Sequence, residues 1–380
     1  MRSSRTSSRG HRVSSLTDGT DGTIALREGE KVDAEALHAW LAETAPELVS
    51  AGARLFIRQF PAGFSNLTYL VTVEHEHGQR ALVLRRPPRG VKAGIAHDMG
   101  REHGILAALH PLGVPVPRPI ARCDDASVIG APFYVMEHVD GVILRGTPPE
   151  SLTDNPAAMP VKLAALSHTF VQSLSRLHAV NVSAEPLASL GRPDRYVQRQ
   201  VQGWTKRWLS SRTDDVPELD WIAQWLEAHR PPDRATTLVH NDFKLDNLVL
   251  EPDLSRVRAI LDWEMATVGD PLMDLGTSLA YWVEAGDAPI FRALGLGITA
   301  LPGNMTRAEL VQAYGQQTGR DVSDAPFYYA FGLFKVSVIA QQIYARHVQG
   351  LTSDARFGVL GEVVKALGVA ARHAAERRGV

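Results

Sequence analysis

The spacing of hydrophobic residues changes along the chain, and in its first part it predicts a β-hairpin. In the segment 67–74, apolar and polar side chains alternate, and a period of two is typical of a strand with one buried face. The segment EHGQ, which ends at Gln79, has the composition of a turn, and RALVLRR follows it as a second strand. The buried face of the first strand contains Leu67, Tyr69, Val71 and Val73.

Periods of three and four residues predict helices on both sides of this hairpin. One covers Val32–Leu48 and a second lies near Asp98–His110. In the second helix, the charged residue Glu102 falls within an apolar stripe. That stripe contains Met99, Leu106 and Leu109. The segment APFYVMEHVDG, at 131–141, then predicts one more buried strand that runs into a turn.

The rest of the chain has mainly helical spacing, which places a boundary between two lobes near residue 138. Three short apolar pieces, TLVH, NLVL and VRAILDW, predict strands among these helices. We therefore expect an α+β fold in which a small β-sheet N-lobe, 21–138, precedes a larger, mainly helical C-lobe, 139–380. The helical spacing is carried by Leu163, Leu166, Phe170, Leu174 and Leu177, and later by Phe331, Phe334 and Val338.

The charge balance of the chain indicates what kind of molecule it binds. The chain has 40 basic and 42 acidic residues, so there is no net field that would attract nucleic acid or a membrane surface, and a small molecule is the expected partner. Cys123 is the only cysteine, which excludes an internal disulfide and a thiolate zinc site and fits a reducing compartment. No apolar run approaches the roughly 20 residues that span a bilayer. We expect a soluble, cytoplasmic protein.

The N-terminal residues do not fit either lobe. Residues 1–17 hold four arginines and six serines with no acid, a composition that buries too little apolar surface to order itself. We expect a disordered Arg/Ser-rich tail over 1–20, and an organelle transit peptide is the alternative.

The chemistry-bearing residues lie in the strand-rich part of the second lobe. The string LVHNDFKLDNLVL places Asp242 and Asn247 between two apolar pieces, and Asp262 follows in ILDWE. A carboxylate five residues before a metal ligand can aim a substrate hydroxyl and accept its proton. Mg²⁺ prefers hard oxygen ligands and takes only one or two from the protein, which Asn247 and Asp262 can supply.

HNDFKLDN followed by ILDWE resembles the catalytic and metal-binding motifs of the aminoglycoside phosphotransferase and choline kinase superfamily. More widely, both motifs resemble the H-R-D-x-x-x-x-N and D-F-G elements of protein kinases. The resemblance covers roughly residues 30–350, and VLRRPP, GRPDRYVQRQVQGW and ATVGDPLMDLG are closest to the kinase domain of certain acyl-CoA dehydrogenases. It implies a two-lobed, protein-kinase-like fold.

The resemblance assigns roles in the C-lobe. Asp242 would be the catalytic base, Asn247 and Asp262 the magnesium ligands, and His240 the residue that holds the catalytic loop. Lys244 would neutralise the γ-phosphate, or it is a solvated lysine. Asp270 is a candidate helix N-cap and Asp274 structural support for the loop. Asn241 stands where the family more often has glycine.

The same resemblance assigns nucleotide contacts in the N-lobe. The segment PAGFSNLTY would cover the phosphates through Gly63, Ser65 and Asn66, unless it is an ordinary turn. Arg85 or Arg86 would contact the α/β-phosphates, and we choose Arg85. Glu102 would pair with Arg85, because a buried charge needs a partner, or it lies in water at the stripe's edge. Glu137 and Val139 complete the candidate set.

These assignments predict an ATP- or GTP-dependent, Mg²⁺-requiring kinase of a small hydroxylated metabolite. The segment Arg192–Arg212 is basic, which disfavours a polycationic aminoglycoside and favours an acceptor of the hydroxyacyl-CoA type. Glu264, Arg199 and Trp204 are the candidate acceptor contacts. The alternatives are an aminoglycoside 3'-type phosphotransferase, a nucleotide-binding pseudokinase, and a phosphatase or nucleotide hydrolase that uses the same metal site.

Overall fold

A computed structural model describes residues 22–50, 52–61, 66–76, 78–88, 97–146, 148–292, 296–352 and 355–380. These residues form two compact units. The first contains the described residues up to Ala107 together with Pro117–His138, and the second contains Ala108–Val116 and the described residues from Val139 to Val380. We describe each unit by itself.

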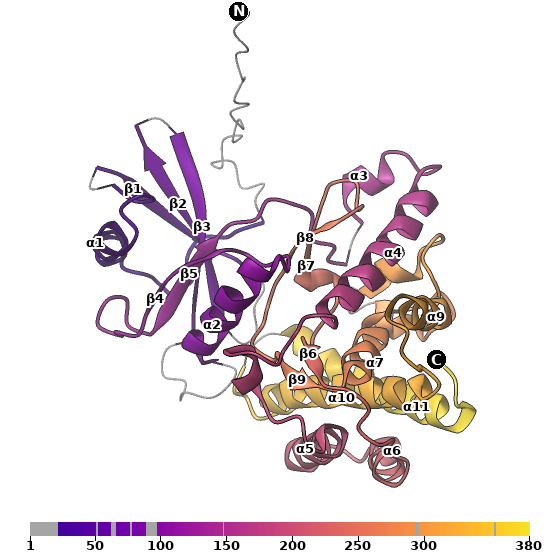
Figure 1. The fold of residues 1–380 in the computed structure, drawn as a ribbon. Coiled ribbons are helices and arrows are strands. Elements are labelled where there is room, and N and C mark those ends of the chain that lie inside the picture. Colours follow the sequence, from indigo (N-terminus) through magenta and orange to yellow (C-terminus); the bar gives the residue numbers. More distant parts are fainter. Residues whose placement is uncertain are drawn as a thin grey trace, which may run out of the picture. The chain divides into compact units, whose positions relative to one another are not determined.

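The first unit is a five-stranded antiparallel sheet with two helices. Its strand order is β1-β2-β3-β5-β4. Figure 1 shows helices α1 and α2 on opposite faces of this sheet. The elements are β1 (Arg54–Gln59), β2 (Leu67–His75), β3 (Gly78–Arg86), β4 (Pro119–Cys123), β5 (Phe133–Glu137), α1 (Ala34–Thr44) and α2 (Met99–Leu109).

Because side chains alternate along each strand, the two faces of the sheet carry different sets of side chains. The alternate residues of β2 that were predicted to be buried join one apolar cluster with α1, which contributes Leu37 and Leu41. Asp33 caps α1, since its carboxylate accepts hydrogen bonds from the N–H groups of Glu35 and Ala36. The hairpin prediction is confirmed, with Leu67 paired to Arg86 and His75 to Gly78. Strands β1 and β4 were not predicted, because neither shows clear alternation.

The second unit is mainly helical and contains two small antiparallel sheets, β6 with β9 and β7 with β8. The short strands are β6 (Thr237–Val239), β7 (Leu248–Leu250), β8 (Val257–Ile260) and β9 (Thr267–Gly269). The helices are α3 (Glu150–Thr153), α4 (Met159–Leu177), α5 (Tyr196–Ser211), α6 (Pro217–Ala228), α7 (Pro271–Tyr281), α8 (Pro289–Phe291), α9 (Arg307–Thr318), α10 (Ala325–Val348) and α11 (Leu360–Arg377).

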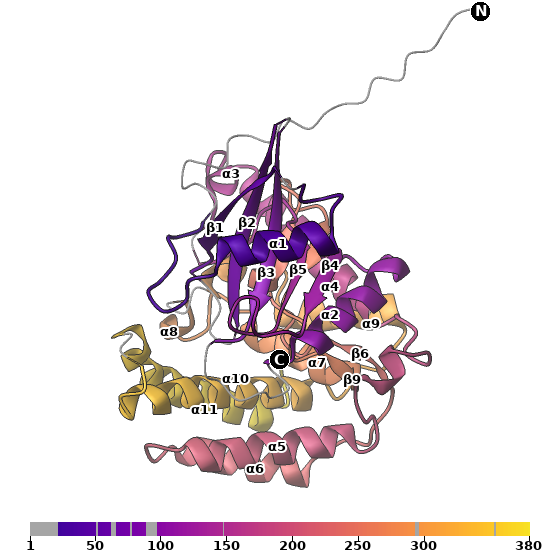
Figure 2. The ribbon, with the colours of Figure 1, turned by 90° about the vertical axis from the view of Figure 1, so that its left-hand side faces the viewer.

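Helix α10 is the centre of the second unit. It packs against α5, α7 and α11 (Figures 1 and 2). Its contact with α7 is made through backbone, because a Cβ built on Gly332 would lie 2.0 Å from the Gly276 carbonyl oxygen and one built on Gly276 would lie 2.1 Å from the Tyr328 carbonyl oxygen. Only glycine allows two helices to approach so closely, so these two positions set the distance between α7 and α10.

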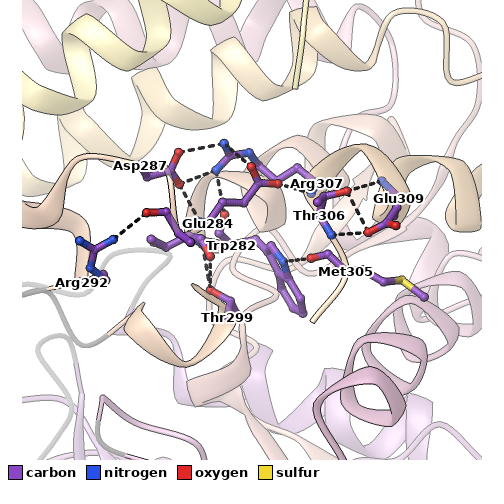
Figure 3. A network of polar contacts seen from close by, with 11 residues as sticks. Trp282, Glu284, Asp287, Arg292, Thr299, Met305, Thr306, Arg307 and Glu309 are labelled. Carbon is purple, nitrogen blue, oxygen red and sulfur yellow. Dashed lines mark hydrogen bonds and ion pairs between the residues drawn. The ribbon is translucent and has the colours of Figure 1, made fainter. Parts of the chain in front are cut away.

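A polar network fixes the segment that leaves α7 to the start of α9 (Figure 3). The Arg307 guanidinium donates to both carboxylate oxygens of Asp287, at 2.6 and 2.9 Å, and to Glu284 Oε2 at 3.2 Å. It also donates to the Trp282 carbonyl oxygen at 3.1 Å. Thr306 and Glu309 form a capping box at the same helix end. The residues that follow α7 are therefore held by the residue at the start of α9.

The predicted α+β class, with a small sheet unit before a larger helical one, is confirmed. Two boundaries were too generous: the helix predicted over Val32–Leu48 covers Ala34–Thr44, and the strand predicted through Trp263 ends at Ile260. Among the described residues, no helix is both long and apolar enough to cross a membrane.

The Gly276–Gly332 contact makes a stability prediction. Gly332→Ala is expected to lower the free energy of unfolding by about 3 kcal/mol or more, because the new methyl group meets backbone that cannot move aside. Gly104→Ala in α2 is the control. A Cβ there meets no atom within 4 Å, so it should be neutral or stabilise by about 0.5–1 kcal/mol. Urea denaturation measures both, and a mild effect at Gly332 would contradict the close approach.

Candidate active site

The catalytic loop, defined here as residues 240–247, connects β6 to β7 in the second unit. His240 is fully buried at its start. Its Nε2 donates to the Leu261 carbonyl oxygen at 2.9 Å, and its Nδ1 accepts from the Asp242 N–H at 3.3 Å. Because a carbonyl only accepts and an amide N–H only donates, these contacts fix the Nε2–H tautomer. His240 thus joins the catalytic loop to the segment that carries Asp262.

The carboxylate of Asp274, in the first turn of α7, holds the backbone at the start of this loop. Its Oδ2 accepts from the His240 N–H at 2.6 Å and from His178 Nε2 at 3.2 Å, and its Oδ1 accepts from the Asn241 N–H at 2.8 Å. Burial alone would raise the pKa of Asp274, but the hydrogen bond from His178, the backbone N–H of His240 and the favourable electrostatics of the two histidines outweigh burial and hold the pKa below its usual range. The Asp274 side chain is buried and ionised.

Asn241 has a left-handed backbone, with φ of 63°. Asparagine tolerates this region better than most residues, which explains how it replaces the glycine more frequent in the family. Its side-chain oxygen accepts from the Tyr196 hydroxyl at 3.1 Å and its Nδ2 donates to the Met265 carbonyl oxygen at 3.1 Å. The Asn241 carbonyl oxygen accepts from Lys335 Nζ at 2.5 Å. The left-handed turn is held from several elements at once.

Asp242 and Asn247 face each other across the loop. Asn247 Nδ2 donates to Asp242 Oδ2 at 3.0 Å and to the Asp242 carbonyl oxygen at 2.9 Å. Since the nitrogen of the amide is directed to Asp242, its oxygen is directed away, as a metal ligand requires. The Asp242 carboxylate remains half-buried, so it keeps access to a reactant.

Lys244 is not a solvated lysine. Its Nζ lies 3.2 Å from Asp242 Oδ2 and 3.7 Å from Asp246 Oδ2, and 4.8 Å from the centre of the Tyr281 ring. Burial lowers the pKa of Lys244, but the carboxylates of Asp242 and Asp246 together with Tyr281 raise it further, and the net pKa is well above the usual value. Lys244 therefore stays charged beside Asp242 and partly balances its charge.

Asp262 stands on the segment that follows β8. It has φ of 66°, a left-handed conformation that is unusual for aspartate and is frequent at functional sites. The preceding Leu261 N–H donates to the Asn247 carbonyl oxygen at 2.8 Å. The chain segments of Asn247 and Asp262 are thus hydrogen-bonded neighbours. One amide oxygen and one carboxylate match the donor set that Mg²⁺ takes from a protein. Among the described residues, no cluster of three or more His, Cys, Asp or Glu could hold a metal ion.

In the first unit, strand alternation sends the two candidate arginines to opposite faces. Arg85 Nε lies 3.5 Å from Glu102 Oε2 of α2, and both side chains are almost fully buried. Arg86 instead donates to the Tyr69 hydroxyl at 2.9 Å and to the Glu30 carbonyl oxygen at 2.9 Å, on the α1 face. The pairing of Arg85 with Glu102 agrees with the prediction, and Glu102 does not lie in water.

The nucleotide contacts predicted for the other residues of the first unit and for Val139 stay predictions. Gly63 and Ser65 lie outside the described residues. Asn66 is buried, and its side-chain oxygen accepts from His97 Nδ1 at 3.0 Å. Glu137, at the end of β5, is exposed and lies 3.4 Å from Arg118. Val139 is the first residue of the second unit after β5.

The candidate acceptor residues lie in different surroundings within the second unit. Trp204 is buried in α5, with Arg207 4.7 Å and Lys335 5.6 Å from its ring centre. Arg199 is exposed, and its guanidinium donates to the carbonyl oxygens of Arg192 and Asp194. Glu264 is half-buried two residues after Asp262. Trp204 is linked to the catalytic loop through Lys335, and Arg199 through Tyr196, whose ring centre lies 6.0 Å from the Arg199 guanidinium and whose hydroxyl donates to Asn241.

Sequence reasoning missed four residues that hold the loop: His178, Tyr196, Tyr281 and Lys335. They lie on or at the ends of helices α4, α5, α7 and α10, outside the catalytic loop. Tyr196 belongs to the GRPDRYVQRQVQGW segment that carries the resemblance, but no role was assigned to it there. The tyrosine in AYW, directly after the apolar face of α7, and the lysine within the apolar run of α10 were the available signals, since a polar group at a core position needs a partner.

Asp274→Asn is expected to destabilise the protein by about 3–5 kcal/mol. The asparagine NH₂ group would face a backbone N–H or the His178 ring N–H, all of which donate, so one buried donor would lose its acceptor. Asp253→Asn is the control: it lies in an exposed turn, where an amide oxygen can still accept from the Ser255 N–H. Since the pKa of Asp274 is lowered on folding, its stabilisation is present above pH of about 3.8 and is lost as the pH falls through the folded-state pKa. Thermal unfolding between pH 2 and 7 should show this acid dependence weakened in the variant.

Residues 57–321 match the Phosphotransferase enzyme family, APH. The chain is 37% identical over 323 residues to the Mus musculus protein named acyl-CoA dehydrogenase family member 10, and the match covers 84% of this chain but 29% of that protein. This chain thus spans less than a third of that relative. The predicted resemblance to a domain of acyl-CoA dehydrogenase proteins is confirmed.

Solved structures agree with the family match. A Ralstonia eutropha protein named for the aminoglycoside phosphotransferases has a TM-score of 0.72 at 32% identity, over 91% of this chain and 99% of its own. Choline kinase from Cryptosporidium parvum has a TM-score of 0.58 at 12% identity, over 91% of this chain and 97% of its own, a likeness that shows the fold alone. The chain therefore belongs to the Phosphotransferase enzyme family and is a phosphotransferase with a kinase-like fold.

Proposed function

We propose that this phosphotransferase moves the γ-phosphate of ATP or GTP, with Mg²⁺, to a hydroxyl group of a small metabolite, and that the acceptor is of the hydroxyacyl-CoA type. The observation that carries the proposal is the arrangement of Asp242, Asn247 and Asp262. The first two are hydrogen-bonded to each other, and the segment of the third is hydrogen-bonded to the backbone of the second.

Asp242 would orient the acceptor hydroxyl and take its proton, since its carboxylate keeps access to a reactant while its position is fixed by Asn247. Lys244 beside it supports this role, because a permanent cation stabilises the negative charge that develops on the transferred group. Asn247 and Asp262 would hold Mg²⁺ through one amide and one carboxylate oxygen. A bound Mg²⁺ supplies charge neutralisation for the phosphate oxygens.

Two observations favour an acyl-CoA-type acceptor. The relative with 37% identity is named acyl-CoA dehydrogenase family member 10, and that name points to the acyl-CoA class of metabolite. The segment of α5 is also rich in cations, with Arg195, Arg199, Lys206 and Arg207, which suits the phosphates of coenzyme A.

The rival functions fit less well. An aminoglycoside 3'-type phosphotransferase needs acids around a polycationic acceptor, and the α5 segment has the opposite charge. A pseudokinase would be expected to lose part of the catalytic set, whereas Asp242, Asn247 and Asp262 are all present. A nucleotide hydrolase would release phosphate without any acceptor, which an assay distinguishes directly.

Asp242→Asn is expected to lower kcat by about 10²–10⁴-fold, the usual contribution of a general base, and to leave nucleotide affinity within about threefold. The measurement is ADP release across hydroxyacyl-CoAs, sugars, amino alcohols and aminoglycosides, with the variant as the blank. If no acceptor exceeds that blank, the kinase proposal fails. Phosphate release without acceptor would favour the hydrolase.

Arg85→Lys and Arg86→Lys form a matched pair for the nucleotide contact. Arg85→Lys keeps the charge beside Glu102 but loses the planar fork, so the Kd for ATP is expected to rise about tenfold. Arg86→Lys should leave that Kd within about twofold and lower the free energy of unfolding by about 1 kcal/mol, because it loses hydrogen bonds on the α1 face. Isothermal titration calorimetry with Mg²⁺ and a non-hydrolysable ATP analogue measures both, and equal effects would contradict the assignment.

A further inference from the structure

A lysine is buried in the middle of α10, directly beside the catalytic loop. Lys335 is 1% exposed, and its flanks in the helix are the apolar residues Phe334 and Val336. Its Nζ donates to the Asn241 carbonyl oxygen at 2.5 Å and to the Thr277 hydroxyl oxygen at 3.4 Å. The Trp204 ring centre lies 5.6 Å from the same nitrogen. All three N–H directions of the ammonium group therefore have an acceptor or a π face.

The contact with Asn241 holds the peptide group that leads into Asp242. The carbonyl oxygen of this peptide group accepts from Lys335, and its N–H, which belongs to Asp242, donates to His240 Nδ1. Both ends of one peptide plane are thus held by side chains. Because the peptide group is planar, these two contacts set the position of the Asp242 Cα atom, from which the carboxylate side chain leaves the backbone.

The fold tolerates an unfavourable charge at this position. Burial lowers the pKa of Lys335 to about 8, although the carboxylates of Asp242 and Asp274 raise it; the cations Lys244 and Arg207 lower it further. Packing alone would be served by leucine or methionine at this site, and neither would carry a desolvated charge. A buried cation that packing does not require indicates a task that only a hydrogen-bonding cation performs.

We propose that Lys335 is a positioning residue for phosphoryl transfer, which holds the Asn241–Asp242 peptide group in the orientation that aims the Asp242 carboxylate. The inference rests on the proposed kinase function for its catalytic consequence, but the structural link between α10 and the loop stands independently. Lys335 acts through Asn241 and does not contact a reactant. Its loss should therefore affect the chemical step more than the binding of nucleotide.

Lys335→Met is the principal variant, because methionine has similar length and no donor. Gln341→Met is its matched control: Gln341 is also buried in α10, but its Nε2 donates to the Ser211 carbonyl oxygen and to Thr213, at the end of α5, away from the loop. The kcat of Lys335→Met should fall about ten- to hundredfold, the loss of one hydrogen bond from a charged donor, while KM for ATP stays within about threefold. Gln341→Met should retain kcat within about twofold.

Amide hydrogen exchange, followed by mass spectrometry, tests the link without any acceptor. In Lys335→Met, peptides that contain residues 240–243 should exchange about tenfold faster or more, and those of β7 and β8 should be unchanged. In Gln341→Met, the faster exchange should lie near residues 208–214 instead. This readout separates the two proposals, because it can succeed even if no acceptor is ever found.

The inference would be overturned by unchanged exchange over residues 240–243 in folded Lys335→Met, or by a kcat of this variant close to that of the wild-type protein. If Lys335→Met does not fold, Lys335→Gln gives the same test, since its amide is shorter than the lysine chain and cannot reach the Asn241 carbonyl in the same geometry. Lys335→Arg, which retains a cationic donor, should recover part of kcat. Equal loss in Lys335→Arg and Lys335→Met would also contradict a positioning role.

Discussion

The buried carboxylate of Asp274 is the constraint on which the candidate active site depends. A desolvated charge is stable only if donors surround it, and here the donors are backbone N–H groups of His240 and Asn241 together with the His178 ring. The charge therefore fixes the start of the catalytic loop to α7. Helix α7 in turn is fixed to α10 by the close approach of Gly276 and Gly332, so the loop inherits its position from the helical core.

The turn at Asn241 shows how several elements share the positioning of one residue. A left-handed asparagine costs about 1 kcal/mol or more relative to ordinary backbone, and it persists because its four polar groups are all used. The partners belong to α5, α7, α10 and the segment before β9. Helix α5 carries two of the candidate acceptor residues, Arg199 and Trp204, so a change there can reach Asp242 through Tyr196 and Asn241 without any contact with the nucleotide.

In the first unit, two adjacent arginines of one strand have different partners. Because successive side chains of a strand point to opposite faces, Arg85 and Arg86 of β3 cannot share a role. Glu102 of α2 takes one of them and Glu30 with Tyr69 the other. Arg85 thereby lies on the sheet face that α2 covers, paired with Glu102. Arg86 lies on the other face and joins the sheet to Glu30, in the chain before α1.

The sequence by itself determined the order of lobes, the hairpin, the long helices and the set of Asp242, Asn247 and Asp262, because periodicity and motif spacing are local properties of the chain. It also indicated that Asp270 caps α7, and its carboxylate accepts from the Leu272 N–H as expected. It also indicated the pairing of Arg85 with Glu102, which the structure shows. Tertiary structure alone decided how Asn241 is held in its left-handed turn and that Lys244 lies against Asp242. It brought His178, Tyr196 and Lys335 to the loop from helices far away in sequence. Such contacts depend on how helices pack, which is set by the volumes and close approaches of the whole core, and no local pattern encodes them.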